Sequence, residues 1–254
     1  MATKVEANGN TDIGQVRAVN QDSFLVKAED DLFVVADGMG GHVGGEIASQ
    51  LCVSEIAKYL GDSADVFKGR ADRPHPDARI QTAMVQAVNH ASTKIYERAL
   101  EDPGLRGMGT TATVCKVVDQ YGYIAHVGDS RLYLIRCGLI YQITNDHSLV
   151  SEQVRAGILT KEEAELHHLR NVITRSVGYQ EEEDVDTTCV LLEDGDLIVM
   201  CSDGLHGPVT DMEISQTVKN TEINSVDSLI QMANDRGGDD NITVVIIKVK
   251  VSAS

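Results

Sequence analysis

The sequence lacks several features that mark whole classes of protein. Its 254 residues include five cysteines, an odd number, spread widely with no Cys-x-x-Cys pair, so a disulfide framework and a zinc site are both disfavoured. The first ten residues, MATKVEANGN, lack the basic and apolar regions of a signal peptide, and no apolar run approaches the roughly 20 residues that a membrane helix needs. We therefore expect a cytoplasmic protein in a reducing compartment.

Basic residues are scarce as well. Lys and Arg total 22 against 39 Asp and Glu, and the net charge is −17. This balance argues against nucleic acid, whose binding depends on cations that neutralise phosphates, and against anionic membrane surfaces. Most of the carboxylates are expected to form a solvated surface, so only a few need to converge on a site.

The remaining composition is that of a soluble globular protein, with 42% hydrophobic and 24% charged residues. Apolar residues at helical spacing predict amphipathic helices at 44–60, 77–100, 211–219 and 224–235. Strands are predicted at 20–27, 31–37, 184–192, 197–201 and 242–251, with a meander of antiparallel strands over 111–143. Residues 1–10 are predicted to be disordered.

The order of these elements is not a β-α-β alternation. It favours sheets packed together with helices outside, an α+β layered architecture. The sequence has no internal repeat and no Pro/Ser-rich linker, so we predict one domain over residues 1–254. Residues 146–175 are charged and His-rich and are predicted to form a surface flap. Asp146 is expected to cap a helix there, and the flap to carry substrate choice, since variable loops beside a rigid site carry specificity.

The most informative stretch is residues 31–45, D-L-F-V-V-A-D-G-M-G-G-H-V-G-G. An apolar strand is followed by a carboxylate, Asp37, then by a glycine-rich turn and the start of a helix. Glycines let the backbone pass close to whatever binds there. The carboxylate indicates that the ligand is a cation, or a group that a cation carries.

The pattern around Asp37 recurs along the chain. Four segments place an aspartate in a sharp turn at one end of an apolar strand, centred on Asp37, Asp129, Asp203 and the pair Asp239–Asp240. One such turn is usually only a turn, but strand ends in one sandwich can meet at a common rim. Carboxylates gathered there suit hard cations such as Mg²⁺ and Mn²⁺ rather than zinc. Two such cations about 4 Å apart can hold a bridging hydroxide, which suits hydrolysis of a phosphate ester.

Other phosphate and calcium motifs do not fit the sequence. The G-x-G-x-x-G fingerprint of dinucleotide-binding sheets fails at Val43, and Asp37 would face the pyrophosphate. The chain has no G-x-x-x-x-G-K phosphate loop and no D-x-D-x-D-G calcium loop.

Eight motifs, in order along the chain, carry a resemblance to a known family. They are V-R-A-V-N-Q-D (16–22), V-A-D-G-M-G-G-H (35–42), G-T-T-A (109–112), V-G-D-S-R (127–131), D-H-S (146–148), T-R-S-V-G (174–178), C-S-D-G-L (201–205) and D-D-N-I-T-V-V (239–245). With them, the chain from about Thr11 to Val249 resembles the metal-dependent protein phosphatases (PPM, type 2C), most of all the compact bacterial members. The resemblance implies a four-layer α-β-β-α sandwich of two antiparallel sheets flanked by helices.

The resemblance also implies a site for two ions of Mn²⁺ or Mg²⁺, with a weaker third. Asp37 resembles the carboxylate that bridges the two core metals, and Gly38 the residue that gives a backbone carbonyl to one of them. Asp203 and Asp240 resemble the remaining protein ligands of the other metal. The choice of Asp240 over Asp239 depends on the family's Asp-Asn pair.

Four further residues correspond to the family's site. Asp22 resembles the acid that holds metal-bound water, and Asp129 the acid associated with the third metal. Arg17 resembles the phosphate-binding arginine, whose planar fork can donate two parallel hydrogen bonds. His42 resembles the proposed general acid for the leaving oxygen. Threonines 110 and 111 could position groups of the site or be structural only.

The implied reaction is hydrolysis of phosphoserine and phosphothreonine in proteins, in which a metal-bridged hydroxide attacks phosphorus in line without a covalent intermediate. The cysteines show no C-x5-R signature, which disfavours a cysteine-phosphatase route. A catalytically silent relative would have lost a metal acid, and a calcium- or magnesium-binding structural protein would leave Arg17 and His42 unexplained. We expect phosphoproteins and a Ser/Thr kinase system as partners, a monomer, and no nucleic-acid or membrane partner.

Overall fold

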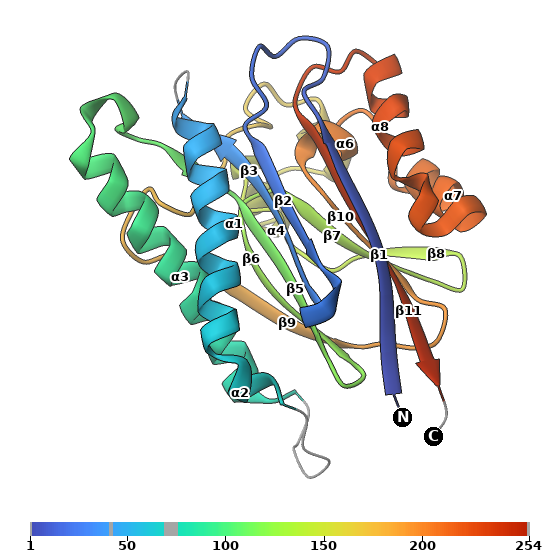
Figure 1. Ribbon diagram of the computed structural model, residues 1–254. Helices are drawn as coiled ribbons and strands as arrows, with labels where there is room; N and C mark the ends of the chain where they lie inside the picture. Colours follow the sequence, from blue (N-terminus) through green and yellow to red (C-terminus); the bar gives the residue numbers. More distant parts are fainter. Residues whose placement is uncertain (1, 41–42, 69–75, 253–254) are drawn as a thin grey trace.

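The computed structural model describes residues 2–40, 43–68 and 76–252 and shows two β-sheets packed face to face, with helices on both outer faces (Figure 1). All strand pairs are antiparallel. The predicted α+β sandwich of two antiparallel sheets is therefore confirmed.

Sheet I contains both ends of the described chain. Its strands follow the order β1-β11-β10-β7-β8, with the bounds Ala2–Asp12 (β1), Ile242–Ser252 (β11), Leu197–Cys201 (β10), Arg131–Arg136 (β7) and Leu139–Gln142 (β8). β1 and β11 pair along their whole length, from Ala2 opposite Ser252 to Asp12 opposite Ile242. The two ends of the described chain, Ala2 and Ser252, consequently lie side by side (Figure 1).

Sheet II follows the order β2-β3-β5-β6-β9, and the short strand β4 pairs with β3. The bounds are Asp22–Lys27 (β2), Leu32–Met39 (β3), Gly109–Thr110 (β4), Ala112–Val118 (β5), Tyr121–Val127 (β6) and Asp186–Leu191 (β9). The strands β6 and β7 follow each other in sequence but belong to different sheets, so the Asp129 turn crosses from one sheet to the other.

Long helices cover the outer face of each sheet (Figure 1). α1 (Gly44–Asp62) and α3 (Ala78–Glu101) pack on sheet II, and α7 (Asp211–Thr221) and α8 (Val226–Asp235) pack on sheet I. Polar caps begin two of them: Asp77 accepts from the Arg79 N–H, and Thr210 forms a capping box with Glu213. Shorter helices are α2 (Ala64–Phe67), α4 (Leu149–Arg155), α5 (Lys161–Glu165) and α6 (Asp203–His206).

The strands bury side chains on both faces, which explains their almost continuous apolar sequences. On β3, Phe33 and Val35 face the other sheet, whereas Leu32, Val34 and Ala36 face the helices of sheet II. On β11, Val245, Ile247 and Val249 face the other sheet, whereas Ile242, Val244 and Ile246 face α6 and α8. The fold thus has three apolar layers, one between the sheets and one under each set of helices.

Two predictions about the strands were wrong. The segment predicted to be disordered was residues 1–10, of which residues 2–10 form most of β1 and Met1 lies outside the described residues; eleven pairings with β11 stabilise this polar segment of low strand propensity. Gly9 allows close packing there, because a Cβ atom would lie 2.9 Å from the Phe24 ring. The strands over 111–143 do not form one meander, since β5 and β6 pair in sheet II and β7 and β8 in sheet I.

The four predicted long helices are confirmed to within two residues at each end. In the part of the chain that the structure describes, no helix is both long enough and apolar enough to cross a membrane.

Candidate metal centre and catalytic site

The acidic residues lie at one end of the layer between the two sheets. Side chains alternate along a strand, so Asp37 points to the same side of β3 as Phe33 and Val35, toward sheet I. Asp22, at the start of β2, is the cross-strand partner of Asp37 and shares its face. The layer that is apolar over most of its length therefore ends in two facing carboxylates.

Asp22 receives hydrogen bonds from the opposite sheet. Its Oδ2 accepts from the Ser202 hydroxyl at 2.7 Å and from the Thr243 hydroxyl at 2.6 Å, and both donors are fully buried. The other oxygen, Oδ1, is buried without a hydrogen-bond partner among the described residues. Asp22 thus joins the two sheets and leaves one carboxylate oxygen available for a ligand.

Asp37 is fixed through its backbone. Its N–H donates to Thr111 Oγ1 at 2.9 Å, and its carbonyl accepts from the Thr111 N–H at 2.8 Å and from Thr110 Oγ1 at 2.9 Å. The next residue must be glycine, because a Cβ on Gly38 would lie 2.0 Å from the Gly45 carbonyl oxygen. The turn into α1 is therefore packed directly against the Asp37 strand end.

Asp203 and Asp240 come from sheet I. Asp203 begins α6, one residue after the end of β10, and its Oδ1 is a second buried carboxylate oxygen without a hydrogen-bond partner among the described residues. Asp240 precedes β11 and accepts from Arg17 Nη2 at 2.6 Å. Arg17 is half-exposed, with 52% of its side chain accessible, so its guanidinium lies at the mouth of the carboxylate group.

Asn241 holds the Arg17 loop in place. Its side-chain carbonyl accepts from the Gln21 N–H at 2.8 Å, and its amide donates to the carbonyls of Ile13 at 2.9 Å and Val19 at 3.1 Å. One buried side chain therefore joins the loop that carries Arg17 to the strand end that carries Asp240.

Asp129 lies in the turn from β6 to β7 and is held from two sides. His206 contacts the Asp129 carbonyl oxygen through Nε2 at 3.0 Å. The preceding residue, Gly128, exchanges two hydrogen bonds with His147. Both contacts act on the backbone, and the Asp129 carboxylate is close enough to Asp203 and Asp146 for their charges to raise its pKa.

The electrostatics of the site are dominated by burial and like charge. Burial, followed by repulsion from Asp22 and Asp203, raises the pKa of Asp37 well above its ordinary value. Burial also raises the pKa of Asp22 to about 7, although the hydroxyls of Thr243 and Ser202 oppose the shift. The pKa of Asp129 rises to about 7 and that of Asp203 to about 6, again mainly through burial. Arg17 has its pKa raised by its hydrogen bond to Asp240.

This donor set fits hard divalent cations. The group offers carboxylate oxygens, two of them buried and unpaired, and the Gly38 carbonyl, which are ligands that Mg²⁺ and Mn²⁺ prefer. A cation would also offset the repulsion that raises the four pKa values. Within residues 2–40, 43–68 and 76–252, however, no three His, Cys, Asp or Glu side chains already form a compact ligand group. The carboxylates are electrostatic neighbours rather than a preassembled ligand shell.

The structure brings six of the predicted site residues to this end of the sandwich: Arg17, Asp22, Asp37, Asp129, Asp203 and Asp240. Gly38 adjoins Asp37, and hydrogen bonds with Thr110 and Thr111 hold the Asp37 backbone in place. His42 lies outside the described residues. The helix-capping role predicted for Asp146 was wrong: Ser148 caps α4, while both Asp146 oxygens accept from Arg131.

Sequence reasoning missed four positioning residues. Ser202 and Thr243 donate to Asp22, Asn241 holds the Arg17 loop, and His206 contacts the Asp129 backbone. A signal for the first two exists in the sequence. In β10, every second residue from Ile198 and Met200 onward faces the other sheet, and Ser202 is the next position in this series. In β11, Thr243 precedes Val245 in the same way. Both are therefore polar residues on the face between the sheets, at a strand end.

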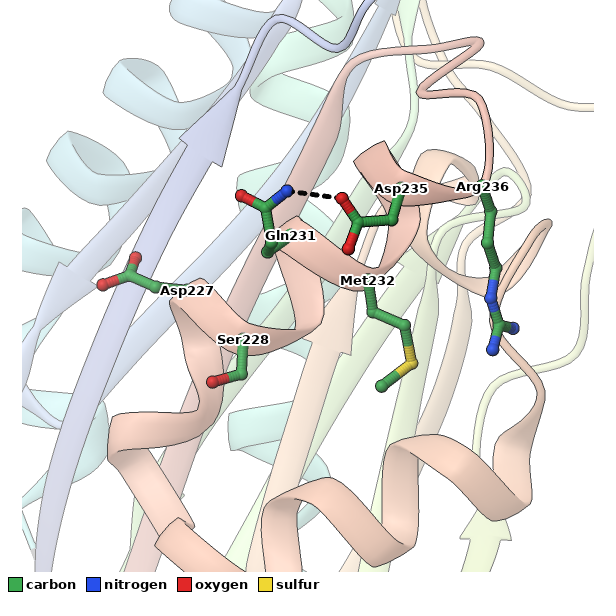
Figure 2. A pocket seen from close by; sticks show the side chains of 6 residues that line it. All are labelled: Asp227, Ser228, Gln231, Met232, Asp235 and Arg236. Carbon is green, nitrogen blue, oxygen red and sulfur yellow. Dashed lines mark hydrogen bonds between the residues drawn. The ribbon is translucent and has the colours of Figure 1, made fainter.

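A separate hollow of about 620 Å³ lies on the outer face of α8, away from the carboxylates. Figure 2 shows its lining of Asp227, Ser228, Gln231, Met232, Asp235 and Arg236. Its polar groups contact one another or their neighbours: Gln231 donates to Asp235 at 2.6 Å, and Arg236 pairs with Glu213 at 2.6 Å. The hollow shares no residue with the acidic site.

Comparison with known proteins agrees with this geometry. A family model described as Protein phosphatase 2C matches residues 14–243. The chain is 36% identical over 245 residues to the protein phosphatase PhpP of Streptococcus pneumoniae serotype 2, covering 94% of this chain and 95% of that protein.

Solved structures give the same result. The serine/threonine phosphatase PstP/Ppp of Mycobacterium tuberculosis superposes with a TM-score of 0.85 at 35% identity, over 97% of this chain and 99% of that one. A PstP catalytic domain in complex with two manganese ions superposes with a TM-score of 0.83 at 34% identity, over 98% of this chain and 100% of that one.

Proposed function

Because the chain belongs to the protein phosphatase 2C family, we propose that it hydrolyses phosphoserine and phosphothreonine in protein substrates without a covalent intermediate. The observation that carries the proposal is the convergence of five aspartates, from five separated segments, at one end of both sheets beside Arg17. A fold needs no such group of repelling, buried carboxylates for its own stability. It is explained by cations and by a phosphate that the cations bind.

Two ions of Mn²⁺ or Mg²⁺ are proposed to bind here, as the PstP domain binds two manganese ions. Asp37 would bridge them, the Gly38 carbonyl would complete one site, and Asp203 and Asp240 would complete the other. When bound, the ions would supply a nucleophilic oxygen at neutral pH and offset the charge of the phosphate. Asp22, through its unpaired Oδ1, would accept a hydrogen bond from water in the site.

The other residues have proposed roles in binding and proton transfer. Arg17 would bind the phosphate through its guanidinium fork. Its pairing with Asp240 and its half-exposed position support this role. Asp129 would hold a third, weaker ion. His42 would protonate the departing serine or threonine oxygen; this role follows from the family alone, since His42 lies outside the described residues.

The biological setting is also proposed. A Ser/Thr kinase would supply the phosphoprotein substrates, and the enzyme would act as a cytoplasmic monomer formed by one catalytic domain, with the flap beside the site. The excess of acidic residues supports a preference for substrates without acidic flanking residues, because the surface would repel them.

The test is hydrolysis of a phosphothreonine peptide with Mn²⁺, with EDTA, and by two matched variants. Asp240→Asn should reduce kcat/KM by roughly 100-fold or more, the loss typical of a metal-site residue. Asp239→Asn changes an exposed neighbour of the same type and should have little effect. Equal losses in both variants would contradict the assignment of Asp240. Turnover that survives both EDTA and Asp37→Asn would contradict the metal-dependent reaction.

A further inference from the structure

His147 connects the base of the flap to the turn that carries Asp129. Its backbone N–H donates to the Gly128 carbonyl at 2.8 Å, and its ring Nδ1 accepts from the Gly128 N–H at 3.1 Å. One residue therefore satisfies both backbone polar groups of the residue directly before Asp129. His147 is only 1% exposed, so water does not compete for these bonds.

The Gly128 turn has little room to move independently. Gly128 has a φ of 111°, and a Cβ atom would lie 2.5 Å from Thr111 Cγ2. Thr111 in turn accepts from the Asp37 N–H and hydrogen-bonds Ser130 at 2.8 Å. A displacement of Gly128 would therefore reach both Asp129 and the Asp37 strand end.

The far side of the His147 ring faces the other end of the flap. Nε2 lies 3.2 Å from Asp186 Oδ2 on β9, a polar contact whose geometry falls outside that of a hydrogen bond. Asp186 also accepts from Arg175 Nη1 at 3.0 Å. Because His147 begins the flap and Arg175 ends it, Asp186 contacts both ends of the excursion.

Backbone hydrogen bonds close the base of the flap between these residues. The Leu149 N–H donates to the Val172 carbonyl at 2.8 Å, and the Thr174 N–H donates to the His147 carbonyl at 2.8 Å. An isolated bridge joins Ser148 and Ile173. Residues 147–149 and 172–174 thus form a paired neck, and His147 is its innermost member.

The ring is held in one orientation and one protonation state. It packs against His126, with ring centroids 5.0 Å apart, and His126 contacts Thr113 Oγ1 through Nδ1 at 3.0 Å. Burial lowers the pKa of His147, although Asp186 opposes the shift. In a neutral ring whose Nδ1 accepts from Gly128, the proton is on Nε2, the nitrogen that lies 3.2 Å from Asp186 Oδ2.

We propose that His147 is a positioning residue that couples the flap to Asp129, so that a phosphoprotein that displaces the neck also shifts the Asp129 turn. The proposal rests on the phosphatase function proposed above, in which Asp129 belongs to the reacting centre. It assigns His147 two separable tasks. Nδ1 fixes the turn, and Nε2 fixes the neck against Asp186.

Three substitutions separate these tasks. In His147→Asn, a side-chain oxygen can take the place of Nδ1 and accept from Gly128, but the side chain is too short to reach Asp186. In His147→Gln, the amide reaches the position of Nε2 and Asp186, but the acceptor for Gly128 is lost. Asp186→Asn weakens the contacts of Asp186 with His147 and Arg175 and leaves both Gly128 hydrogen bonds in place.

Activity is measured with Mn²⁺ on a small aryl phosphate and on a phosphorylated protein. His147→Gln should lose roughly 10-fold or more in kcat on both substrates, the range for residues that orient metal ligands, and should need more Mn²⁺ for half-maximal activity. His147→Asn and Asp186→Asn should keep kcat on the aryl phosphate within about threefold and raise KM for the phosphoprotein, since only the neck is loosened.

A second readout does not depend on activity. Amide hydrogen exchange of the metal-free protein should accelerate at residues 128–130 in His147→Gln, and at 147–149 and 172–174 in Asp186→Asn. His90→Asn is the matched control, because His90 pairs with Glu55 at 3.0 Å between α3 and α1, away from the flap. It should change neither exchange at 128–130 nor KM.

Two results together would overturn the proposal. His147→Asn and His147→Gln would lose activity equally, in proportion to the loss of folded protein, and amide hydrogen exchange at residues 128–130 would stay unchanged in both. His147 would then be a packing residue only. If the wild-type protein hydrolyses neither substrate, the proposed function fails instead, and the exchange measurements still decide whether His147 holds the Asp129 turn.

Discussion

Asp22 and Asp37 lie directly opposite each other in the β2–β3 ladder, with both side chains in the layer between the sheets. Like charges at directly opposed positions destabilise a sheet, and burial favours the protonated acids, which raises both pKa values. Asp22 Oδ2 accepts hydrogen bonds from Ser202 and Thr243 of the opposite sheet, whereas Asp22 Oδ1 has no partner among the described residues. The two carboxylates therefore destabilise the metal-free fold, and a bound cation would offset this effect.

Replacing one of the two acids should therefore separate stability from activity. In the presence of a chelator at pH 8, Asp22→Asn should be more stable than the wild type by roughly 1 kcal/mol or more, because the repulsion is removed. Its phosphatase activity should fall by roughly 10- to 100-fold. Thermal unfolding and phosphopeptide hydrolysis measure the two effects. A variant that is less stable than the wild type under chelation would contradict this account.

The difference in stability between the wild type and Asp22→Asn should depend on pH in a defined direction. The pKa of Asp22 is about 7 in the fold against an ordinary value of 3.8, so between these values the folded protein retains a proton that the unfolded chain has released. The contribution of this proton to the free energy of unfolding is fully present below about pH 4 and is lost as the pH rises toward 7. The stability of the wild type minus that of Asp22→Asn should fall over this range, by an amount on the order of 1–4 kcal/mol.

Buried histidines also make the stability depend on pH, but their effect cancels when the wild type is compared with Asp22→Asn. Burial lowers the pKa of His126 to about 4, so its contribution to stability is lost as the pH falls below 6.5 and has the opposite slope. Because both proteins contain it, it does not affect the difference. Denaturant unfolding at several pH values, with chelator present, measures the curve. A difference that is flat from pH 4 to 7 would mean that Asp22 is not desolvated.

Gly38 and Gly61 form a matched pair of glycine substitutions. In Gly38→Ala, the new Cβ would lie 2.0 Å from the Gly45 carbonyl oxygen and 2.5 Å from that of Gln21, so the backbone at the metal site must shift. We expect a loss of about 1–3 kcal/mol of stability together with loss of Mn²⁺ binding. At Gly61, near the end of α1, an added Cβ would have no neighbouring atom within 4 Å.

Gly61→Ala should therefore leave activity unchanged and add up to about 1 kcal/mol of stability, the difference in helix propensity between the two residues. Denaturant unfolding and calorimetric titration with Mn²⁺ compare both variants with the wild type. Normal Mn²⁺ affinity in Gly38→Ala would show that this backbone carbonyl is not a ligand.

Thiol reagents should not inhibit the enzyme. Cys52, Cys115 and Cys201 are buried, and burial raises the pKa of each thiol to about 12, so they hold little reactive thiolate. Cys137 is the exposed cysteine in the β7–β8 turn. Iodoacetamide should modify Cys137 first and leave phosphatase activity unchanged, as followed by mass spectrometry and peptide hydrolysis. Inactivation that persists in Cys137→Ser would point to one of the other thiols.

Most strands other than β1, the long helices and the family were predictable from the order of the amino acids. Apolar runs buried on both faces and helical periodicity are local properties, so β3, β10, β11, α1 and α3 could be recognised from them. The aspartates at strand ends were equally visible. Their meeting at one rim was a hypothesis, and the structure brings Asp129, Asp203 and Asp240 close enough to Asp37 for their charges to raise its pKa.

Which distant residues meet depends on the folded chain as a whole. β1 is a strand because β11, more than 200 residues away, pairs with it. The partners of Asp22 come from residues 202 and 243, and Asp146 binds Arg131 rather than a helix end. Periodicity shows which face a side chain occupies, but not which segment lies against that face. That choice depends on long-range packing, which no local pattern encodes.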